Sequence, residues 1–452
     1  MKKTLHPGWI TCLPLFIALL IHFPTRSQTL PAKLDTLLTA YARQHSFNGS
    51  ALVARQDTVL LEKGYGYKNI AAHIPHDSNG IFQIGSITKQ FTSAIILQLE
   101  EKKKLSLQDK LSRYIPDYPR GNEITIENLL THTSGIYNYT NDGDFMKNKT
   151  TRPINRDSLI ARFKNKPLDF TPGEKFNYSN SGYILLGYII EKVTGKPYFR
   201  VVKENIFQPL HMRHSGFNFT GLSGPDKAIG YASLSTDQPA DIVDSSVSFA
   251  AGAIYTTTGD LYKWDRALYT GRIISQASLQ KAFTPYKSHY GYGWGIDSAF
   301  GKKIVQHGGG ITGFVSFILR VPEDGTCVIL LSNQPTPTLG KIAADINAVL
   351  NGKEVTLPKD RKEITLDTAI LQQYVGGYEL APGFVITITV EDGKLISQAT
   401  GQGKAELFAE KENFFFLKIV DAQIEFIKGA DGKIEKLMLY QNGRQIPGKK
   451  IK

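Results

Sequence analysis

Cysteine is nearly absent from this chain of 452 residues, which contains only Cys12 and Cys327. Cys12 lies inside an apolar N-terminal run, and Cys327 lies in the apolar stretch Thr326–Leu331. The sequence therefore excludes a framework of internal disulfides and a cysteine-rich metal site. We expect Cys327 to be a buried thiol, because a free cysteine in such a stretch packs like a small apolar side chain.

Motifs of several other chemistries are missing as well. No His-x-x-x-His pair occurs, and the closer pairs, His73 with His76 and His211 with His214, have no third-ligand motif, so we expect no metal and no other cofactor. The net charge of +12 comes from basic residues scattered along the chain, without an arginine-rich or aromatic-interleaved stripe. We therefore expect solvated charge and no nucleic-acid partner.

The N-terminus has the pattern of an export signal. Lys2 and Lys3 precede an apolar run from Trp9 to Phe23, and a polar segment follows. This pattern predicts a signal peptide over residues 1–28 that is cleaved near its end. A membrane anchor is the alternative, but the run is short for a bilayer span and contains Pro14. We expect a periplasmic or extracellular protein with no transmembrane segment after cleavage.

A helix is predicted from Thr88 to Lys102, because this segment has no glycine or proline and apolar side chains repeat every four residues from Phe91 to Leu99. At about 100° per residue, Ser86, Lys89 and Ser93 fall on the opposite face. Leu97 falls there too, so we expect that face to line a partly buried pocket rather than to face open water.

Ser86 and Lys89 form a Ser-x-x-Lys pair whose spacing places both side chains on one helical turn. Lys89 can then take the hydroxyl proton of Ser86, and apolar surroundings would lower the pKa of Lys89 toward that of a base. The helix start directs N–H groups and positive dipole toward a developing oxyanion. The same spacing at Ser278 and Lys281 has no companion motif, and we interpret it as coincidence.

A second cluster is Tyr178-Ser179-Asn180. The phenol of Tyr178 can exchange protons with Ser86 or with a leaving group. The side-chain amide of Asn180 offers a donor and an acceptor to a peptide-like acyl group. The alternative is that these residues only cap a helix predicted over Asn180–Val193.

A third cluster is His307-Gly308-Gly309-Gly310, inside a strand-like run. Its glycines would let a substrate backbone lie against an edge strand. The N–H of Gly310, together with that of Ser86, would form an oxyanion hole. A glycine-rich hairpin turn with an incidental histidine is the alternative.

The pattern along the chain predicts a sheet that the chain leaves and rejoins. Predicted elements are a helix over 30–44, paired strands over 50–54 and 58–61, mostly helical segments over 105–244, strands over 290–296, 313–321 and 327–331, and a helix over 340–350. From about Leu366 onward, short alternating runs with turn signals such as Asp392-Gly393 predict a separate all-β unit. A polar linker over 353–365 precedes it.

The three clusters together resemble those of the serine β-lactamase and penicillin-binding-protein superfamily, most closely its branch of class C β-lactamase-like hydrolases, D-aminopeptidases and family VIII esterases. The resemblance covers roughly residues 30 to 350 and includes Leu129–Gly135, Phe176–Tyr183 and Ala251–Tyr255. It implies an α+β fold with an antiparallel sheet flanked by helices and a helical subdomain. We therefore assign residues 29–352 to this domain, with the helical subdomain over about 105–244.

By the same resemblance, Ser86 is the acylated nucleophile, and Lys89 and Tyr178 share general acid and base duty. His307 and Gly309 form the third motif, which in lactam-binding relatives usually begins with lysine. A histidine there is largely neutral at pH 7, which argues against efficient β-lactam hydrolysis. His132 is implied to be a structural loop residue. Residues 366–452 resemble a lipocalin-like β-barrel that follows some of these enzymes.

Two function classes follow. The first is an exported serine hydrolase that cleaves amide, peptide or ester bonds in a small-molecule or peptide substrate, including peptidoglycan-derived ones. The second is a non-turnover penicillin-binding or peptidoglycan-fragment sensor. A Ser-His-Asp hydrolase using His307 or His132 is a weaker rival, because no Gly-x-Ser-x-Gly turn exists. The acyl substrate, the role of the C-terminal unit and the oligomeric state stay open.

Overall fold

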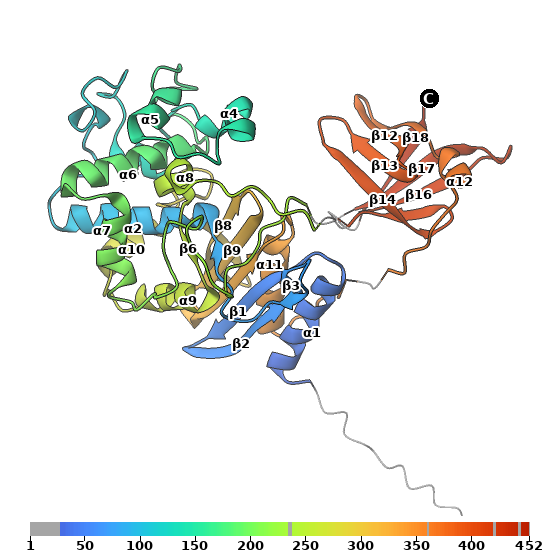
Figure 1. Ribbon diagram of the computed structural model, residues 1–452, viewed down its shortest axis with the longest axis horizontal. Coiled ribbons are helices and arrows are strands. Elements are labelled where there is room, and N and C mark those ends of the chain that lie inside the picture. The colour runs from blue at the N-terminus through green and yellow to red at the C-terminus, as the bar shows by residue number, and fades with distance from the viewer. Residues whose placement is uncertain (1–27, 234–236, 359–360, 419–421, 442–443, 452) are drawn as a thin grey trace, which may run out of the picture.

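The computed structural model describes residues 28–233, 237–358, 361–418, 422–441 and 444–451 (Figure 1). The predicted signal peptide lies outside these residues, apart from Gln28. None of the helices in the described ranges is long and apolar enough to cross a membrane.

A six-stranded antiparallel sheet forms the centre of the first unit, with strand order β2-β1-β10-β9-β8-β7. Its strands are β1 (Gly49–Arg55), β2 (Thr58–Tyr65), β7 (Gly295–Ala299), β8 (Lys302–Ile311), β9 (Phe314–Val321) and β10 (Thr326–Ser332). Strand β1 pairs with β10, so that Ala51 lies opposite Leu330. The N-terminal hairpin therefore joins strands that follow more than 200 residues later, which confirms the predicted departure from and return to one sheet.

The two faces of the sheet are covered by different helices, because successive side chains of a strand point to opposite faces. Val53 and Leu330 belong to a core with α1 (Leu30–Arg43) and α11 (Leu339–Leu350). Leu52 belongs to the larger core on the other face, with α2 (Thr88–Glu101) and the remaining helices of the first unit. Cys327 is buried in β10, as predicted.

Helix α2 runs through the interior, and every residue from Thr88 to Leu99 is buried. The expected apolar face is present, but the opposite face is also packed. Polar side chains of the helix find partners in neighbouring segments: Thr92 Oγ1 donates to the carbonyl of Ala250 (2.7 Å), and Gln90 Oε1 accepts from Trp264 Nε1 (3.1 Å), whereas Gln90 Nε2 is buried without a partner. The start of α2 is thereby fixed from all sides.

The segments between β2 and β7 supply the rest of the helical layer. They are α3 (Ile126–Leu130), α4 (Gly143–Asn148), α5 (Arg156–Lys164), α6 (Asn180–Thr194), α7 (Tyr198–Val202), α8 (Ser245–Gly252), α9 (Thr258–Ala267) and α10 (Gln276–Ala282), with small strands β3 (Tyr67–Asn69), β4 (Ile74–Pro75), β5 (Phe82–Gln83) and β6 (Tyr255–Thr256). Short helical turns lie at η1 (Gly85–Ile87), Leu111–Arg113, Tyr139–Asn141, Lys203–Phe207 and Pro322–Asp324. Helices thus continue beyond residue 244.

The C-terminal unit is a closed barrel of eight antiparallel strands, which confirms the predicted all-β barrel (Figure 1). The strands are β11 (Gly376–Ala381), β12 (Phe384–Glu391), β13 (Lys394–Ala399), β14 (Lys404–Lys411), β15 (Phe414–Phe416), β16 (Ala422–Lys428), β17 (Ile434–Gln441) and β18 (Arg444–Lys450). The short helix α12 (Thr368–Gln372) precedes them and contacts β12 and β13.

The strand predicted over 290–296 is wrong for most of its length. Residues 290–294 are irregular, and β7 begins only at Gly295. Gly293 has φ +80°, and a Cβ on it would lie 2.8 Å from Ser93 Oγ. The segment therefore packs against α2 instead of extending the sheet.

A buried ion pair ties β9 to α9 and gives a test of the fold. Arg320 Nε lies 2.8 Å from Asp265 Oδ1, and both side chains are almost fully buried. Asp265→Asn should lower the free energy of unfolding by about 3 kcal/mol, because it leaves the buried guanidinium uncompensated. Denaturant unfolding measures this. Glu123→Gln, which removes an exposed pair with Arg120, is the control and should cause no resolvable change.

Candidate active site

Ser86 lies in the helical turn η1, immediately before α2, and its side chain is partly exposed. Its N–H belongs to the first turn, whose N–H groups have no intrahelical acceptor. The preceding Gly85 has φ +49°, and a Cβ on it would meet backbone atoms of Gly310 at 2.7 to 2.9 Å. Glycine at position 85 therefore lets the Ser86 turn and strand β8 approach each other closely.

Lys89 is fully buried, and its Nζ has three hydrogen-bond partners. They are Ser86 Oγ (3.0 Å), Asn180 Oδ1 (2.8 Å) and the carbonyl oxygen of Ala251 (2.8 Å). Burial lowers the pKa of Lys89 well below its ordinary value, which favours the neutral amine. The predicted Ser86–Lys89 contact is present, whereas Lys281 at the other Ser-x-x-Lys spacing pairs with Glu100.

A backbone kink in α8 supplies one of these partners. Phe249 has φ 38° and ψ −129°, which interrupts the helix. The carbonyls of Ala250 and Ala251 then accept hydrogen bonds from α2, through Thr92 and Lys89. A non-glycine residue in this conformation is strained. The strained residue directly precedes the two residues whose carbonyls turn toward α2.

Tyr178 lies beside Ser86 and Lys89. Its phenol shares a hydrogen bond with Ser86, and Lys89 Nζ lies 5.0 Å from the centre of its ring. Burial raises the pKa of Tyr178 far above its ordinary value, so the phenol keeps its proton at neutral pH. Ser179 is the N-cap of α6 but its side chain makes no capping hydrogen bond, so the helix-capping alternative has no support from that residue.

His132 holds this segment in place. Its ring lies 4.1 Å from the ring of Tyr178, and its Nδ1 accepts from the N–H of Ser179 (3.1 Å). Burial, together with the nearby Lys89 and His307, lowers the pKa of His132 well below its ordinary value. The neutral ring thus acts as a backbone acceptor, in line with the structural part implied for it.

Asn180 begins α6 and lines the cleft beside Ser86. Its Oδ1 accepts from Lys89, and its Nδ2 donates to Thr140 Oγ1 (3.2 Å). The side-chain oxygen is therefore committed to Lys89. A primary amide has two N–H groups, so one remains for a substrate carbonyl.

Strand β8 has a free edge next to Ser86. Its partner β7 pairs only with Lys302–Gln306, so the strand is unpaired on that side from His307 to Ile311. Ile311 and Phe314 close a two-residue turn and form a hydrogen-bonded pair. The next pair, Gly310 with Val315, is therefore a non-hydrogen-bonded pair, in which the backbone N–H and C=O of Gly310 point away from β9. The N–H of Gly310 is thereby directed toward the Ser86 turn.

Gly309 and His307, both predicted to bind substrate, are not among the described residues that line the cleft. A Cβ on Gly309 would lie 2.0 Å from the carbonyl oxygen of Ile84, so this glycine makes room for the chain that enters Ser86. His307 is buried, with Nδ1 close to the carbonyl of Gly308 (2.6 Å) and Nε2 close to the hydroxyl of Tyr290 (2.9 Å). Gly310 does line the cleft.

His307 is uncharged at neutral pH, as predicted. Burial and the nearby Lys89 lower the pKa of His307 to about 4. The hydroxyl of Tyr290 has a raised pKa, mainly from burial, and keeps its proton. Tyr290 therefore donates to Nε2, while Nδ1 carries the proton that is given to Gly308.

The cleft at Ser86 is small and uncharged. Its described lining residues are Gly85, Ser86, Tyr139, Thr140, Met146, Asn180, Val243, Val247, Ser248, Ala251, Gly252, Gly310, Ile311 and Thr312. Lys89 contacts Ser86 Oγ but is fully buried and does not line the cleft. Among these lining residues there is no Lys, Arg, Asp or Glu, so the lining offers no charged side chain to a bound group.

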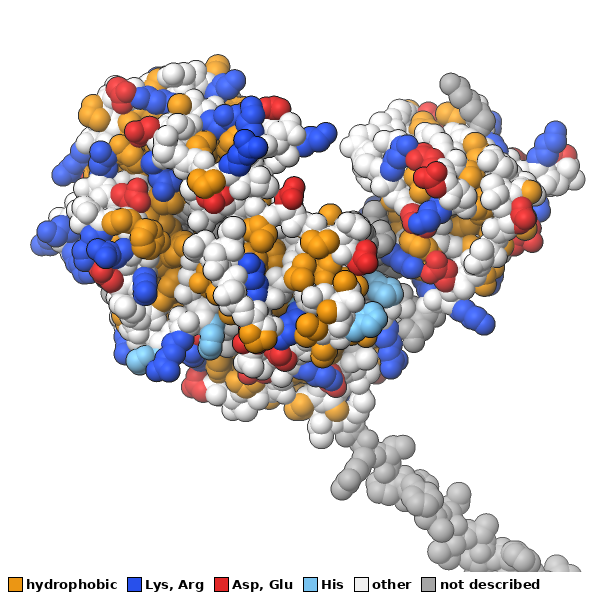
Figure 2. Space-filling view, in the orientation of Figure 1, with side chains coloured by type: hydrophobic (Ala, Val, Ile, Leu, Met, Phe, Trp, Pro, Cys, Tyr) orange, Lys and Arg blue, Asp and Glu red, His pale blue; other side chains and the backbone are white. Residues whose placement is uncertain are grey.

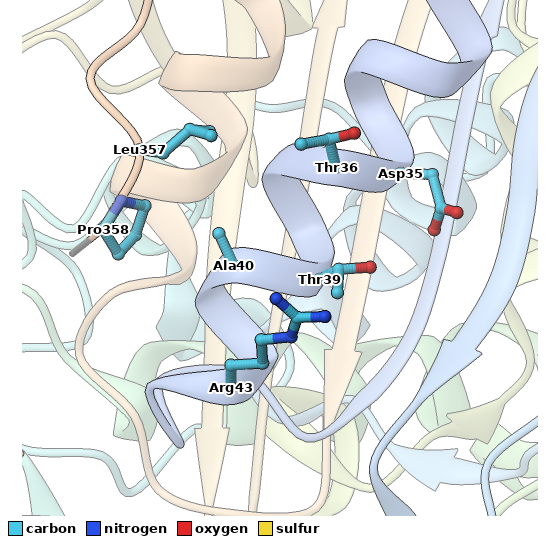
Figure 3. Close-up of a pocket in the computed structure, with 7 residues that line it drawn as sticks. All are labelled: Asp35, Thr36, Thr39, Ala40, Arg43, Leu357 and Pro358. Carbon is cyan, nitrogen blue, oxygen red and sulfur yellow. The ribbon is translucent and has the colours of Figure 1, made fainter. Parts of the chain in front are cut away.

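A second groove lies on the other side of the sheet, where Leu357 and Pro358 lie beside α1 (Figure 3). It is lined by Asp35, Thr36, Thr39, Ala40, Arg43, Leu357 and Pro358. None of these lining residues forms a pair of a hydroxyl and a buried amine like that of Ser86 and Lys89. On the face in Figure 2, Lys and Arg side chains are interspersed with Asp and Glu rather than gathered in a stripe. The structure describes no group of three metal-ligating side chains.

Some contributors to the site had no signal in the sequence. Ala251 contributes a backbone carbonyl, which residue type does not reveal. Tyr290 comes from the irregular segment that the alternation of side chains assigned to a strand. The apolar residues Met146 and Val247 come from separate helices and meet only in the folded chain.

Adjacent glycines of β8 provide a matched test of this packing. Gly309→Ala should lower the free energy of unfolding by about 2 kcal/mol, because its Cβ collides with the carbonyl of Ile84. Gly310→Ala should be neutral for stability, since a Cβ there meets nothing within 4 Å. Thermal and denaturant unfolding of both variants decide the matter. Equal losses would contradict the close approach of β8 to the Ser86 turn.

Comparison with known proteins agrees with this geometry. Residues 34–351 match the Beta-lactamase family, and residues 360–450 match a domain family of unknown function, DUF3471. The chain is 32% identical over 442 residues to Penicillin-binding protein 4* of Bacillus subtilis (strain 168), covering 91% of this chain and 97% of the relative.

Two solved structures are similar as well. The octameric penicillin-binding protein homologue from Pyrococcus abyssi has a TM-score of 0.66 and 27% identity, and the match covers 92% of this chain and 99% of that one. A D-stereospecific amidohydrolase from Streptomyces sp. has a TM-score of 0.60 and 26% identity over 70% of this chain and 99% of that one. This chain therefore belongs to the β-lactamase family of serine hydrolases.

Proposed function

We propose that the protein is an exported hydrolase that cleaves amide, peptide or ester bonds through an acyl-enzyme on Ser86. The observation that carries this proposal is the environment of Lys89 Nζ, which contacts Ser86 Oγ and two further acceptors while fully buried. Export is supported by the N-terminal sequence alone, through its two lysines and the apolar run that follows.

Lys89 is the proposed base. A neutral amine has two N–H groups and one lone pair, and the oxygens of Asn180 and Ala251 can accept only from N–H groups. With both N–H groups used there, the lone pair is left for the hydroxyl of Ser86. The proton of Ser86 moves to Lys89 as Oγ attacks the carbonyl carbon of the substrate.

The oxyanion formed by this attack would lie between two N–H groups. One is the N–H of Ser86 in the first helical turn, and the other is that of Gly310 at the free edge of β8. Their proximity is supported by the contact between Gly85 and Gly310. Such preorganised donors stabilise the transition state because they need no rearrangement during the reaction.

Tyr178 is the proposed acid. Because its phenol keeps its proton, it can donate to the nitrogen or oxygen of the leaving group when the tetrahedral intermediate collapses. The proton held by Lys89 then restores the phenol. Water attacks the carbonyl carbon of the resulting ester of Ser86 and gives its proton to the neutral amine of Lys89. Lys89 returns that proton to Oγ as the bond between Oγ and the carbonyl carbon breaks, and the acid product leaves.

An uncharged substrate is favoured at the acyl site. β-Lactam antibiotics carry a carboxylate, and the lining residues of the cleft include no cation to hold it. His307, where lactam-binding relatives usually have lysine, is neutral and engaged by Tyr290. The D-stereospecific amidohydrolase among the similar structures supports an amide substrate. We therefore propose a D-amino-acid peptidase or esterase rather than an efficient β-lactamase.

Binding without turnover is a second candidate, because a relative that aligns with nearly the whole chain is named a penicillin-binding protein. The two candidates differ in one observable. A hydrolase forms the ester of Ser86 and releases it, whereas a sensor forms it and keeps it.

Ser86→Ala should abolish hydrolysis, with a fall of at least about 10⁴-fold in kcat/KM, because the nucleophile is removed. The measurement is hydrolysis of an activated ester, a D-amino-acid peptide amide and a β-lactam, with intact-mass detection of the adduct on Ser86. Ser278→Ala, at the other Ser-x-x-Lys pair, is the control and should keep full activity. Residual turnover in the Ser86→Ala variant would exclude the mechanism, and a lasting adduct without product in the unaltered protein would favour the sensor.

Asn180→Asp should move the acid limb of the kcat/KM profile to higher pH by about 1 to 3 units, because a carboxylate beside Lys89 raises its pKa. Lys89 must be neutral to act, so a raised pKa means that activity is lost earlier as the pH falls. Thr140→Val removes a neighbouring partner of Asn180 without adding charge, and its acid limb should stay in place. An unmoved limb in the Asn180→Asp variant would show that Lys89 does not set it.

A further inference from the structure

The C-terminal barrel contains a cavity that the hydrolytic chemistry does not use. The cavity has a volume of about 540 Å³ and lies inside the barrel. All of its lining residues fall between Leu380 and Ile446. Small-molecule sites typically occupy about 300 to 1,000 Å³. A barrel of eight strands is wide enough either to fill with side chains or to hold one small ligand.

One end of the barrel is filled. Tyr374 stacks on Phe426 at 4.4 Å and meets Phe415 edge-on at 5.3 Å. Its hydroxyl donates to the carbonyl of Glu412 (2.8 Å), in the turn between β14 and β15. Leu371 of α12 belongs to the same core. These groups close the end at which α12 lies.

The other end is hollow because its inward positions carry small side chains. The strand register places Ala399 opposite Ile386 and Ser397 opposite Ala405, and all four line the cavity. The inward positions two residues further along β13 and β14, at Leu395 and Leu407, are large and belong to the packed core. The cavity thus occupies the half of the barrel near the β13–β14 turn.

Apolar side chains predominate in the lining of the cavity, and its polar side chains are Ser397, Gln402, Lys404 and Gln441. The hydroxyl of Ser397 already donates to the carbonyl of Ala405 (3.2 Å). Lys404 at the rim is paired with Glu391 at 2.7 Å, so it adds no uncompensated charge. Among the described barrel residues, no buried polar side-chain atom lacks a hydrogen-bond partner. A ligand in this cavity must therefore be mainly apolar, with any polar group at the rim.

We propose that this barrel binds a single acyl-chain molecule, with the chain inside the cavity and the polar end at the rim beside Lys404 and Gln402. At about 30 Å³ for a water-sized group, the volume accommodates up to about 18 non-hydrogen atoms. That size fits a chain such as dodecanoate. Because Lys404 is neutralised by Glu391, the cavity selects for the chain and not for a charged head.

The test is calorimetric titration of the full-length protein with dodecanoic acid and with 1-dodecanol. Both should bind one molecule per chain with similar affinity and a negative heat-capacity change, which reports burial of apolar surface. Ser86→Ala should bind equally well, because the cavity is independent of the hydrolytic site. Absence of binding by both compounds would overturn the proposal.

A pair of variants on β13 locates the site. Ala399→Trp fills the cavity and should weaken binding by at least about tenfold. Gln398→Trp places the same ring on the outer face of the same strand, where position 398 is exposed, and should leave affinity unchanged. Ala405→Phe, with its unfolding curve, serves as a second filled variant if Ala399→Trp fails to fold. Equal binding by filled and outer-face variants would show surface adsorption and refute the cavity.

Discussion

The buried amine of Lys89 is the constraint around which the catalytic half of the molecule is arranged. A buried amine needs a partner for each of its polar positions. Its three partners come from separate parts of the chain: the turn before α2, the start of α6 and the kink in α8. The same contacts that make burial of Lys89 tolerable also bring Ser86, Asn180 and the helical layer together. Stability of the interior and geometry of the site therefore depend on the same hydrogen bonds.

The sheet contributes to the site through the point at which pairing stops. Pairing between β7 and β8 ends at Gln306, and the following unpaired segment of β8 runs past Ser86. Two glycines have different parts there: Gly309 permits contact with Ile84, and Gly310 faces the cleft. Because His307 is turned toward Tyr290, the cleft has no fixed positive charge from this strand. The shape of the site and the absence of a cation from this strand in its lining thus have a common origin in the β8 register.

Helix phase and residue chemistry were sufficient to predict that Ser86 and Lys89 meet, and that the segment 178–180 joins them. Neither Gly309 nor His307 is among the described residues that line the cleft, and the strand predicted over 290–296 is wrong for most of its length. Alternation along a sequence identifies two faces of a strand, but which face meets a helix is set by pairing with a distant strand. Gly293 interrupts the strand through a contact with α2 that no local pattern contains.

The sequence by itself determined the chemical groups, the spacing of the Ser86–Lys89 pair, the two structural units and the all-β character of the second. These depend on periodicities of a few residues, which local geometry converts directly into helices and strands. The tertiary structure decided how the pKa values of Lys89, Tyr178 and His307 depart from their ordinary values, because such shifts depend on burial and on neighbours from other elements. It also decided that half of the barrel is hollow, since a cavity arises from side chains on different strands that meet only when the barrel closes.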